Sequence, residues 1–321
     1  MILRSLPSML LMSPGKSRPD SVGGRQASGL TIAALTVFVL NAGAVLRADE
    51  PKCVATPHVV TNSIGMKFVA VPAGTFQMGS PETEAGSRVD ERPVHEVEIS
   101  RPFLMGVYEV TQGEYQKVIG ANPSYFSADG PGAKKVAGLT TDRFPVEQVS
   151  WIEADDYCKK LSELPEEIAA HRRYRLPTEA EWQYACRAGN SAPFQFGAAL
   201  GSKDANINGN FPYGGASRGP FLARTTQVGS YAPNAFGLYD MHGNVAEMVG
   251  DWYGRFYYQT SPKVDPKGPE QGADRVVLGG SWGTDAARCR AGFRRSNATS
   301  GKAYFFGFRV ICEQQPIEAA K

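Results

Sequence analysis

The stretch that decides the fold reads YRLPTEAEWQYACRAG and runs from Tyr174 to Gly189. It predicts a short strand and then a helix. A Thr followed three residues later by a Glu forms a capping box, in which the two side chains satisfy free N–H groups of the first turn. That pair is Thr178 and Glu181, and Gly189 is a typical helix end. Three residues at helical spacing are expected to face inward, namely Trp182, Ala185 and Cys186.

Two further capping boxes precede this segment, at Thr111/Glu114 and Ser150/Glu153. The first helix should end near Gly120. The second carries a buried stripe at a spacing of three and four, made by Ala154, Tyr157, Cys158 and Leu161.

The rest of the chain predicts short strands and long loops. Residues 62–79 alternate around a Pro-Ala-Gly turn, and further strands are expected at 94–99 and 103–110. Residues 190–236 are rich in Gly, Asn, Ser and Pro and should form loops. Residues 275–282 and 305–312 read as two buried strands that flank an arginine-rich loop. The expected class is α+β with little regular secondary structure.

Seven strings in order resemble the formylglycine-generating enzyme, or sulfatase-modifying factor, domain. They are FQMGS, YEVTQGEY, PVEQVSW, YRLPTEAEWQYACRAG, GLYDMHGNVAEM, LGGSW and GFRV. The resemblance covers about residues 60–313 and implies an irregular fold related to C-type lectins. We therefore place the domain at 61–315, after a leader at 51–60 and before a tail at 316–321.

The N-terminal residues 1–50 read as a signal peptide or an anchor. Residues 30–46 are uncharged and follow a segment with four basic residues and one acid, and small residues come next. Seventeen residues are at the lower limit for a membrane span, so a cleaved signal is favoured over an anchor. We expect an exported protein, periplasmic or extracellular, that meets a membrane only through this segment. The net charge of +2 gives no reason to expect nucleic acid.

The resemblance also implies a copper site that this chain does not complete. Active family members oxidise a sulfatase cysteine to formylglycine with copper and oxygen, using two cysteines five positions apart. Counted from Ser281, the two positions hold Thr284 and Cys289. Counted back from GFR, Arg294 matches the active-site Arg and Cys289 falls past both positions. Neither register provides the two thiolates that Cu(I) prefers, so copper is not expected. The remaining catalytic candidates are Thr284, Cys289, Arg294, Ser296 and Asn297.

Five cysteines allow a disulfide framework in an exported protein. The resemblance implies bridges Cys158–Cys312 and Cys186–Cys289, with Cys53 left over. Four domain cysteines permit three connectivities, so the residues alone leave the pairing open.

The string GLYDMHGNVAEM resembles a calcium turn of the family. The expected ligands are carbonyl oxygens around Gly243 and Val245 and the carboxylate of Glu247, with Asn244 shaping the turn. A plain loop is the alternative. A second calcium position would begin at Asn206 and Ile207, but residues 220–222 lack the acid it needs, so we expect it to be weak or lost.

Two functions stay open. The first is a non-oxidase module with structural calcium that binds an extended peptide or another exported protein. The second is a formylglycine-generating oxidase with an altered site or another metal. The arginine-rich loop has two interpretations. Its arginines either line a groove for an acidic or extended peptide or pair with Asp240, Asp251 or Glu247 in the core. The arginines concerned are Arg288, Arg290, Arg294 and Arg295.

Overall fold

Residues 59–314, which the computed structural model describes, form two main sheets, a hairpin, four α-helices and long loops. The predicted signal or anchor at 1–50, with its apolar run 30–46, lies outside the described residues, as does the tail 316–321. The first strand begins at Val59 and pairs with the second, so the domain starts slightly before the predicted bound at residue 61. No helix within 59–314 is long and apolar enough to cross a membrane.

The five-stranded sheet joins the two ends of the domain. Its order is β1 (Val59–Thr61), β2 (Lys67–Val71), β5 (Phe103–Gly106), β11 (Ile311–Gln314) and β6 (Arg172–Arg175). All its pairs are antiparallel, and the last strand of the chain lies between β5 and β6. The C-terminal strand is therefore an inner strand, and its side chains help to close the core.

The four-stranded sheet carries the arginine-rich loop. Its order is β10 (Phe306–Gly307), β7 (Ala246–Trp252), β8 (Asp274–Leu278) and β9 (Arg295–Ala298). Strand β9 was predicted as loop, because its residues RSNA have no apolar alternation; it forms by pairing with β8. A separate hairpin consists of β3 (Gly74–Met78) and β4 (His95–Ile99).

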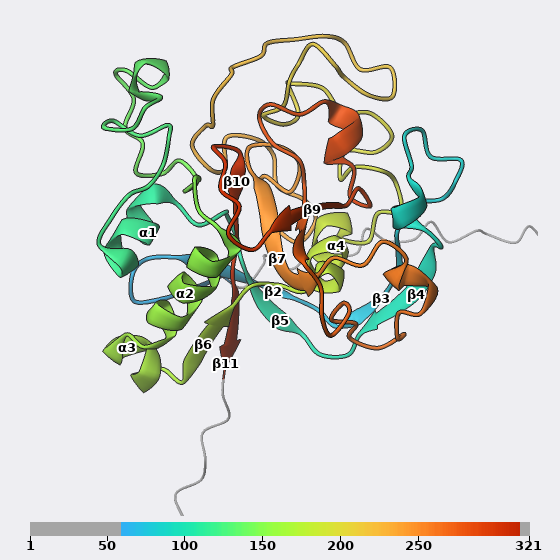
Figure 1. Ribbon diagram of the computed structural model, residues 1–321, viewed down its shortest axis with the longest axis horizontal. Coiled ribbons are helices and arrows are strands. Elements are labelled where there is room, and N and C mark those ends of the chain that lie inside the picture. Colours follow the sequence, from blue (N-terminus) through green and yellow to red (C-terminus); the bar gives the residue numbers. More distant parts are fainter. Residues whose placement is uncertain (1–58, 315–321) are drawn as a thin grey trace, which may run out of the picture. The chain divides into compact units, whose positions relative to one another are not determined.

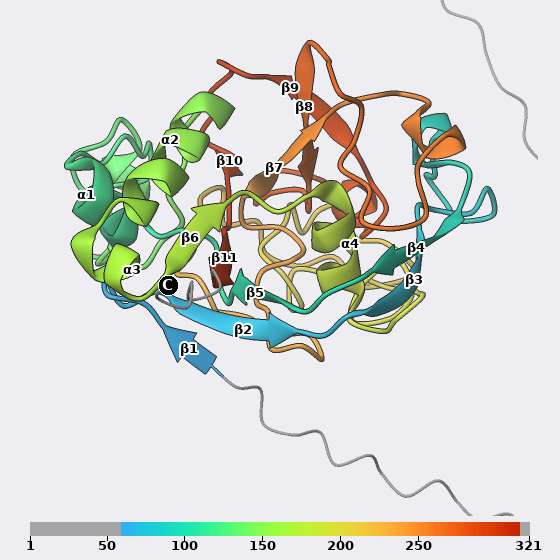
Figure 2. The ribbon, with the colours of Figure 1, turned by 90° about the horizontal axis from the view of Figure 1, so that it is seen from below.

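All three predicted capping boxes are present. They start α1 (Gln112–Ile119), α2 (Trp151–Ser162) and α4 (Glu179–Arg187), and the unpredicted α3 (Pro165–Ala169) follows α2. Figures 1 and 2 show α1, α2 and α3 together on the side of β6, with the β3–β4 hairpin at the opposite side of the domain. Helix α4 buries its predicted inward face against the core, where Trp182 is fully buried.

Residues 190–236 contain no helix or strand, as predicted. The expected strand 103–110 ends at Gly106, and the expected strand 305–312 splits into β10 and β11. The split occurs because Phe308 and Val310 pack into the core while the chain passes from one sheet to the other. The α+β class with little regular secondary structure is confirmed.

Candidate functional site

Thr284 and Cys289 lie side by side at the start of the arginine-rich loop. Thr284 Oγ1 is 3.5 Å from Cys289 Sγ and donates a hydrogen bond to the Ser281 carbonyl. Cys289 ends the short helix η4 (Ala286–Cys289), which is capped by the side chain of Asp285. This contact agrees with the register counted from Ser281. Gly280 has a φ of +69°, and a Cβ there would collide with Cys289 Sγ, so the Gly-Gly-Ser turn is needed for the close approach.

The Cys289 thiol is fully buried and neutral. Its Sγ donates to the Asp285 carbonyl at 3.6 Å, and burial raises its pKa to about 12. A thiolate is the form that binds metals and attacks electrophiles, and this environment disfavours it. One buried thiol beside one hydroxyl does not fit copper, which requires soft sulfur ligands.

The other three catalytic candidates lie in different surroundings. Arg294 is fully buried and makes a bidentate ion pair with Glu179, at 2.6 and 2.7 Å. Ser296 Oγ donates to Asp274, and Asn297 Nδ2 donates to the Gly301 carbonyl within a turn. None of the three hydrogen-bonds to Thr284 or Cys289 within residues 59–314. The structure therefore separates the predicted catalytic set into two groups.

The arginine-rich loop divides between core and surface. Arg290 is fully buried and is held by Glu91 and Glu84, and Arg294 by Glu179. The interpretation that the arginines pair with acids of the core is thus correct for Arg290 and Arg294, although their partners are not the predicted Asp240, Asp251 and Glu247. Arg288 and Arg295 contact no buried acid. Short-range sequence patterns cannot identify partners that lie 115 or 199 residues away along the chain.

The predicted calcium turn is the centre of a buried polar network. Asn206 Nδ2 donates to Asn244 Oδ1 at 3.1 Å, so the two predicted calcium positions meet. Asn244 Nδ2 and the Val245 N–H both donate to the carboxylate of Glu109. Glu109 was missed from the sequence; its place in YEVTQGEY, a string shared with the family, was the available signal.

Glu247, the predicted carboxylate ligand of calcium, is held by Arg309 and Trp182. Arg309 donates to both its oxygens, at 2.6 and 2.7 Å, and Trp182 Nε1 donates at 2.8 Å. An ionised carboxylate has about four lone-pair sites, so these three donors leave one site, on Oε1. Within residues 59–314, no group of three or more His, Cys, Asp and Glu side chains has a metal-binding arrangement. Calcium binding by residues 243–247 stays a prediction without support from these contacts.

The four cysteines of residues 59–314 are separate buried thiols. The His242 ring lies near both partners of one predicted bridge: Nε2 is 3.7 Å from Cys186 Sγ, and Nδ1 is 2.7 Å from the Cys289 carbonyl oxygen. Burial lowers the pKa of His242 to about 4, so the ring is neutral. Neither predicted bridge is formed in this structure, and the pairing stays a prediction.

A row of aromatic rings lies at the surface beside the arginine-rich loop. We call Tyr125, Phe221, Trp282 and Tyr304 the aromatic row. Neighbouring ring centroids are 6.0 Å apart for Phe221–Trp282, 5.7 Å for Trp282–Tyr304 and 5.1 Å for Tyr304–Tyr125. Phe221 and Tyr304 are each 40% exposed. The rings come from three distant segments, and Trp282 is two residues from Thr284, so the aromatic row borders the family's catalytic position.

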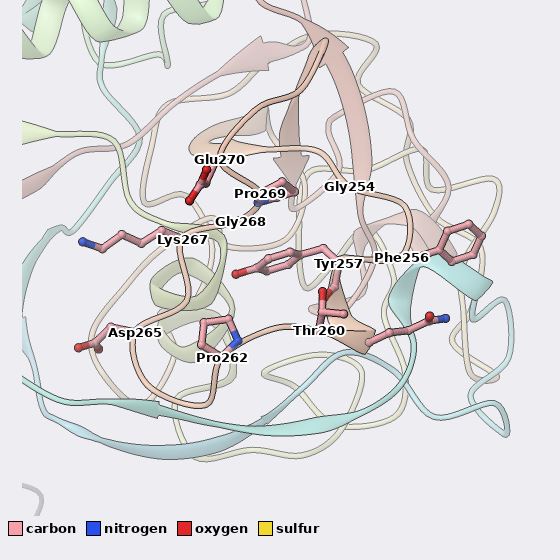
Figure 3. Close-up of a pocket in the computed structure, with 11 residues that line it drawn as sticks. Gly254, Phe256, Tyr257, Thr260, Pro262, Asp265, Lys267, Gly268, Pro269 and Glu270 are labelled. Atoms are coloured by element: carbon pink, nitrogen blue, oxygen red, sulfur yellow. The ribbon is translucent and has the colours of Figure 1, made fainter.

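A cavity of about 740 Å³ is formed by the loop between β7 and β8. Figure 3 shows Tyr257 between the Pro262 and Pro269 segments, with Lys267 and Glu270 at the edge. None of the predicted site residues lines this cavity. The cavity is open to solvent on one side. None of its lining residues is a buried acid or base of the kind that catalysis requires, so it is a secondary candidate for the functional site.

The chain belongs to the family described as the sulfatase-modifying factor enzyme 1-like domain, which matches residues 56–314. It is 31% identical to the formylglycine-generating enzyme of Streptomyces coelicolor over 308 residues, covering 82% of this chain and 92% of that protein. It is 30% identical to the hercynine oxygenase of Mycolicibacterium smegmatis over 280 residues, covering 75% of this chain and 60% of that protein.

The structure of PvdO from Pseudomonas aeruginosa has a similar fold. Its TM-score is 0.66 at 34% sequence identity, and the match covers 81% of this chain and 99% of that chain. A formylglycine-generating enzyme and a hercynine oxygenase are thus both relatives, and membership in the family leaves the activity of this chain open.

Proposed function

We propose that this chain is a non-oxidase member of the family, an exported module that binds an extended peptide or another exported protein. The observation that carries the proposal is the pair Thr284 and Cys289. A hydroxyl stands beside the single thiol of the loop, and that thiol is buried with a raised pKa. Copper-dependent oxidation needs two thiolates at one site, and this site has at most one.

The aromatic row supports the binding part of the proposal. Tyr and Trp side chains combine a large apolar face with a polar atom and are enriched at protein interfaces. Trp282 Nε1 already donates to the Tyr304 carbonyl at 3.1 Å, which fixes the ring in place. A surface that is ordered before binding loses less side-chain freedom when a partner docks.

An oxidase assay with a matched variant tests the proposal. The purified protein is incubated with a copper salt, a reductant, oxygen and a cysteine-containing sulfatase peptide, and formylglycine is measured by mass spectrometry. We expect no product, and no tight Cu(I) binding in a competition titration with a chelator. Thr284→Cys adds a second sulfur beside Cys289 and should raise Cu(I) affinity, which is a readout independent of activity. Copper-dependent conversion by the unsubstituted protein would refute the proposal and establish the alternative, an oxidase with an altered site.

A further inference from the structure

Arg295 has an unusual environment for an arginine. It begins β9, and its guanidinium lies over two phenylalanine rings, 4.9 Å from the centroid of Phe306 and 5.7 Å from that of Phe305. Among the arginines of residues 59–314 that are at least partly buried, Arg295 alone neither donates a side-chain hydrogen bond nor forms an ion pair. The fully buried Arg290, Arg294 and Arg309 each hold a carboxylate.

A second cation lies close to Arg295. Burial lowers the pKa of Arg295, and the neighbouring charge of Arg288 lowers it further. Arg288 is 63% exposed and is balanced only by Asp285, at 3.4 Å. Arg288 thus adds positive charge near Arg295, and no ion pair within residues 59–314 neutralises Arg295. A partly desolvated cation without a partner is unfavourable, and an anion from outside would remove that cost.

Phe305 connects Arg295 with the aromatic row. The Phe305 ring, which lies under Arg295, is 5.5 Å from the Tyr304 ring, and Tyr304 stacks with Trp282. Arginine bound to aromatic faces keeps its planar donors free to bind a carboxylate in bidentate geometry. The surface therefore offers two adjacent features. The guanidinium group can donate hydrogen bonds to an anion, and the row of rings can contact an aromatic or apolar side chain.

We infer that the ligand of this surface is an acidic extended peptide, with a carboxylate at Arg295 and an aromatic side chain on the aromatic row. The inference rests on the proposed binding function and specifies its ligand. Arg295 is the specificity determinant, because it selects the charge of the partner. The rings contribute area, and area alone does not distinguish an acidic partner from a basic one.

The test is a titration of the purified protein with three labelled peptides, followed by fluorescence anisotropy. The probes are Glu-Glu-Phe-Glu-Glu, Lys-Lys-Phe-Lys-Lys and Glu-Glu-Ala-Glu-Glu. We expect the first to bind, the second not to bind, and the third to bind more weakly. Binding of the first peptide should weaken as salt is raised, because salt screens exposed charges.

Two variants of equal charge separate this surface from general electrostatics. Arg295→Gln should weaken binding of the acidic aromatic peptide about tenfold, the loss expected for one charge-assisted hydrogen bond. Arg255→Gln is the control, because Arg255 also lies over a phenylalanine ring, at 5.4 Å from Phe256, but is remote in sequence from the aromatic row. It should leave binding unchanged.

Three outcomes would overturn the inference. They are equal weakening by both variants, equal binding of the acidic and basic peptides, and inorganic phosphate binding as tightly as the first peptide. Each of them leaves the non-oxidase proposal standing, since that proposal fails only on copper-dependent oxidation. A circular dichroism spectrum of Arg295→Gln that matches the unsubstituted protein confirms that a loss of binding is not a loss of fold.

Discussion

Replacing Arg309 with Met should destabilise the protein strongly, and more at neutral than at acidic pH. Arg309 is fully buried and donates to both oxygens of Glu247 and to the carbonyls of Gly106 and Tyr239. It is also the one cation whose charge lowers the pKa values of both Glu109 and Asp240. Removing it leaves three buried acids without a counter-charge.

The expected loss in the free energy of unfolding is that of removing one partner of a buried ion pair, which typically costs about 3–5 kcal/mol. The pH dependence follows from the acids. Burial raises the pKa of Asp240 from 3.8 to about 6, and burial and Asp240 raise that of Glu109. A carboxyl group whose pKa is higher in the folded than in the unfolded state stabilises the fold through its protonated form. That contribution is fully present below the unfolded-state pKa and is lost as pH rises through the folded-state pKa. Without Arg309 both folded values rise further, so the penalty is larger at pH 7.5 than at pH 5.

Urea denaturation followed by tryptophan fluorescence at the two pH values measures this difference. Lys160→Met is the control, because its pair with Asp156 is about half exposed on both sides and should contribute roughly 0–0.5 kcal/mol. If Arg309→Met does not fold at pH 7.5, its unfolding is measured at pH 5, and Arg309→Lys is compared at both. A loss below about 1 kcal/mol that is equal at the two pH values contradicts the reasoning.

Three further predictions concern the cap, the cysteines and calcium. Thr178→Ala removes the capping bond to the Glu181 N–H and should cost about 1 kcal/mol in the free energy of unfolding, whereas Thr260→Ala, at an exposed turn, should cost less than half of that. If the cysteines are thiols, as in the structure, alkylation after denaturation without reductant should modify Cys158, Cys186, Cys289 and Cys312. The two predicted bridges would instead protect all four, and mass spectrometry distinguishes the two cases. Because Arg309 and Trp182 already donate to Glu247, EDTA should leave the thermal midpoint unchanged, and a fall of several degrees that calcium reverses would confirm the calcium prediction.

Features that depend on neighbours in the chain were predictable. The capping boxes at Thr111, Ser150 and Thr178 use residues three apart, and all three helices begin there. The inward stripes of α2 and α4 follow from the helical period alone. The absence of regular structure at 190–236 follows from its glycines and polar residues, which favour turns.

Features that depend on distant partners were not predictable from local patterns. Residue types identified Arg290, Arg294 and Glu247 as important, but not whether each faces a ligand or an ion pair. The partners Glu91, Glu179 and Arg309 come from other elements of the fold. Strand β9 likewise depends on β8, since its own sequence has no strand pattern.

The division between core and surface arginines shows how this fold can be kept while its function changes. Arg290, Arg294 and Arg309 each neutralise a buried acid, so substitutions there should lower stability whatever the ligand is. Arg288 is mostly exposed and Arg295 forms no ion pair within residues 59–314, so substitutions there should alter binding at little cost in stability. Within one loop, Arg288 and Arg295 flank Arg290 and Arg294. A chain can therefore lose the second thiol and gain a cationic face without disturbing the ion pairs that hold the loop in place.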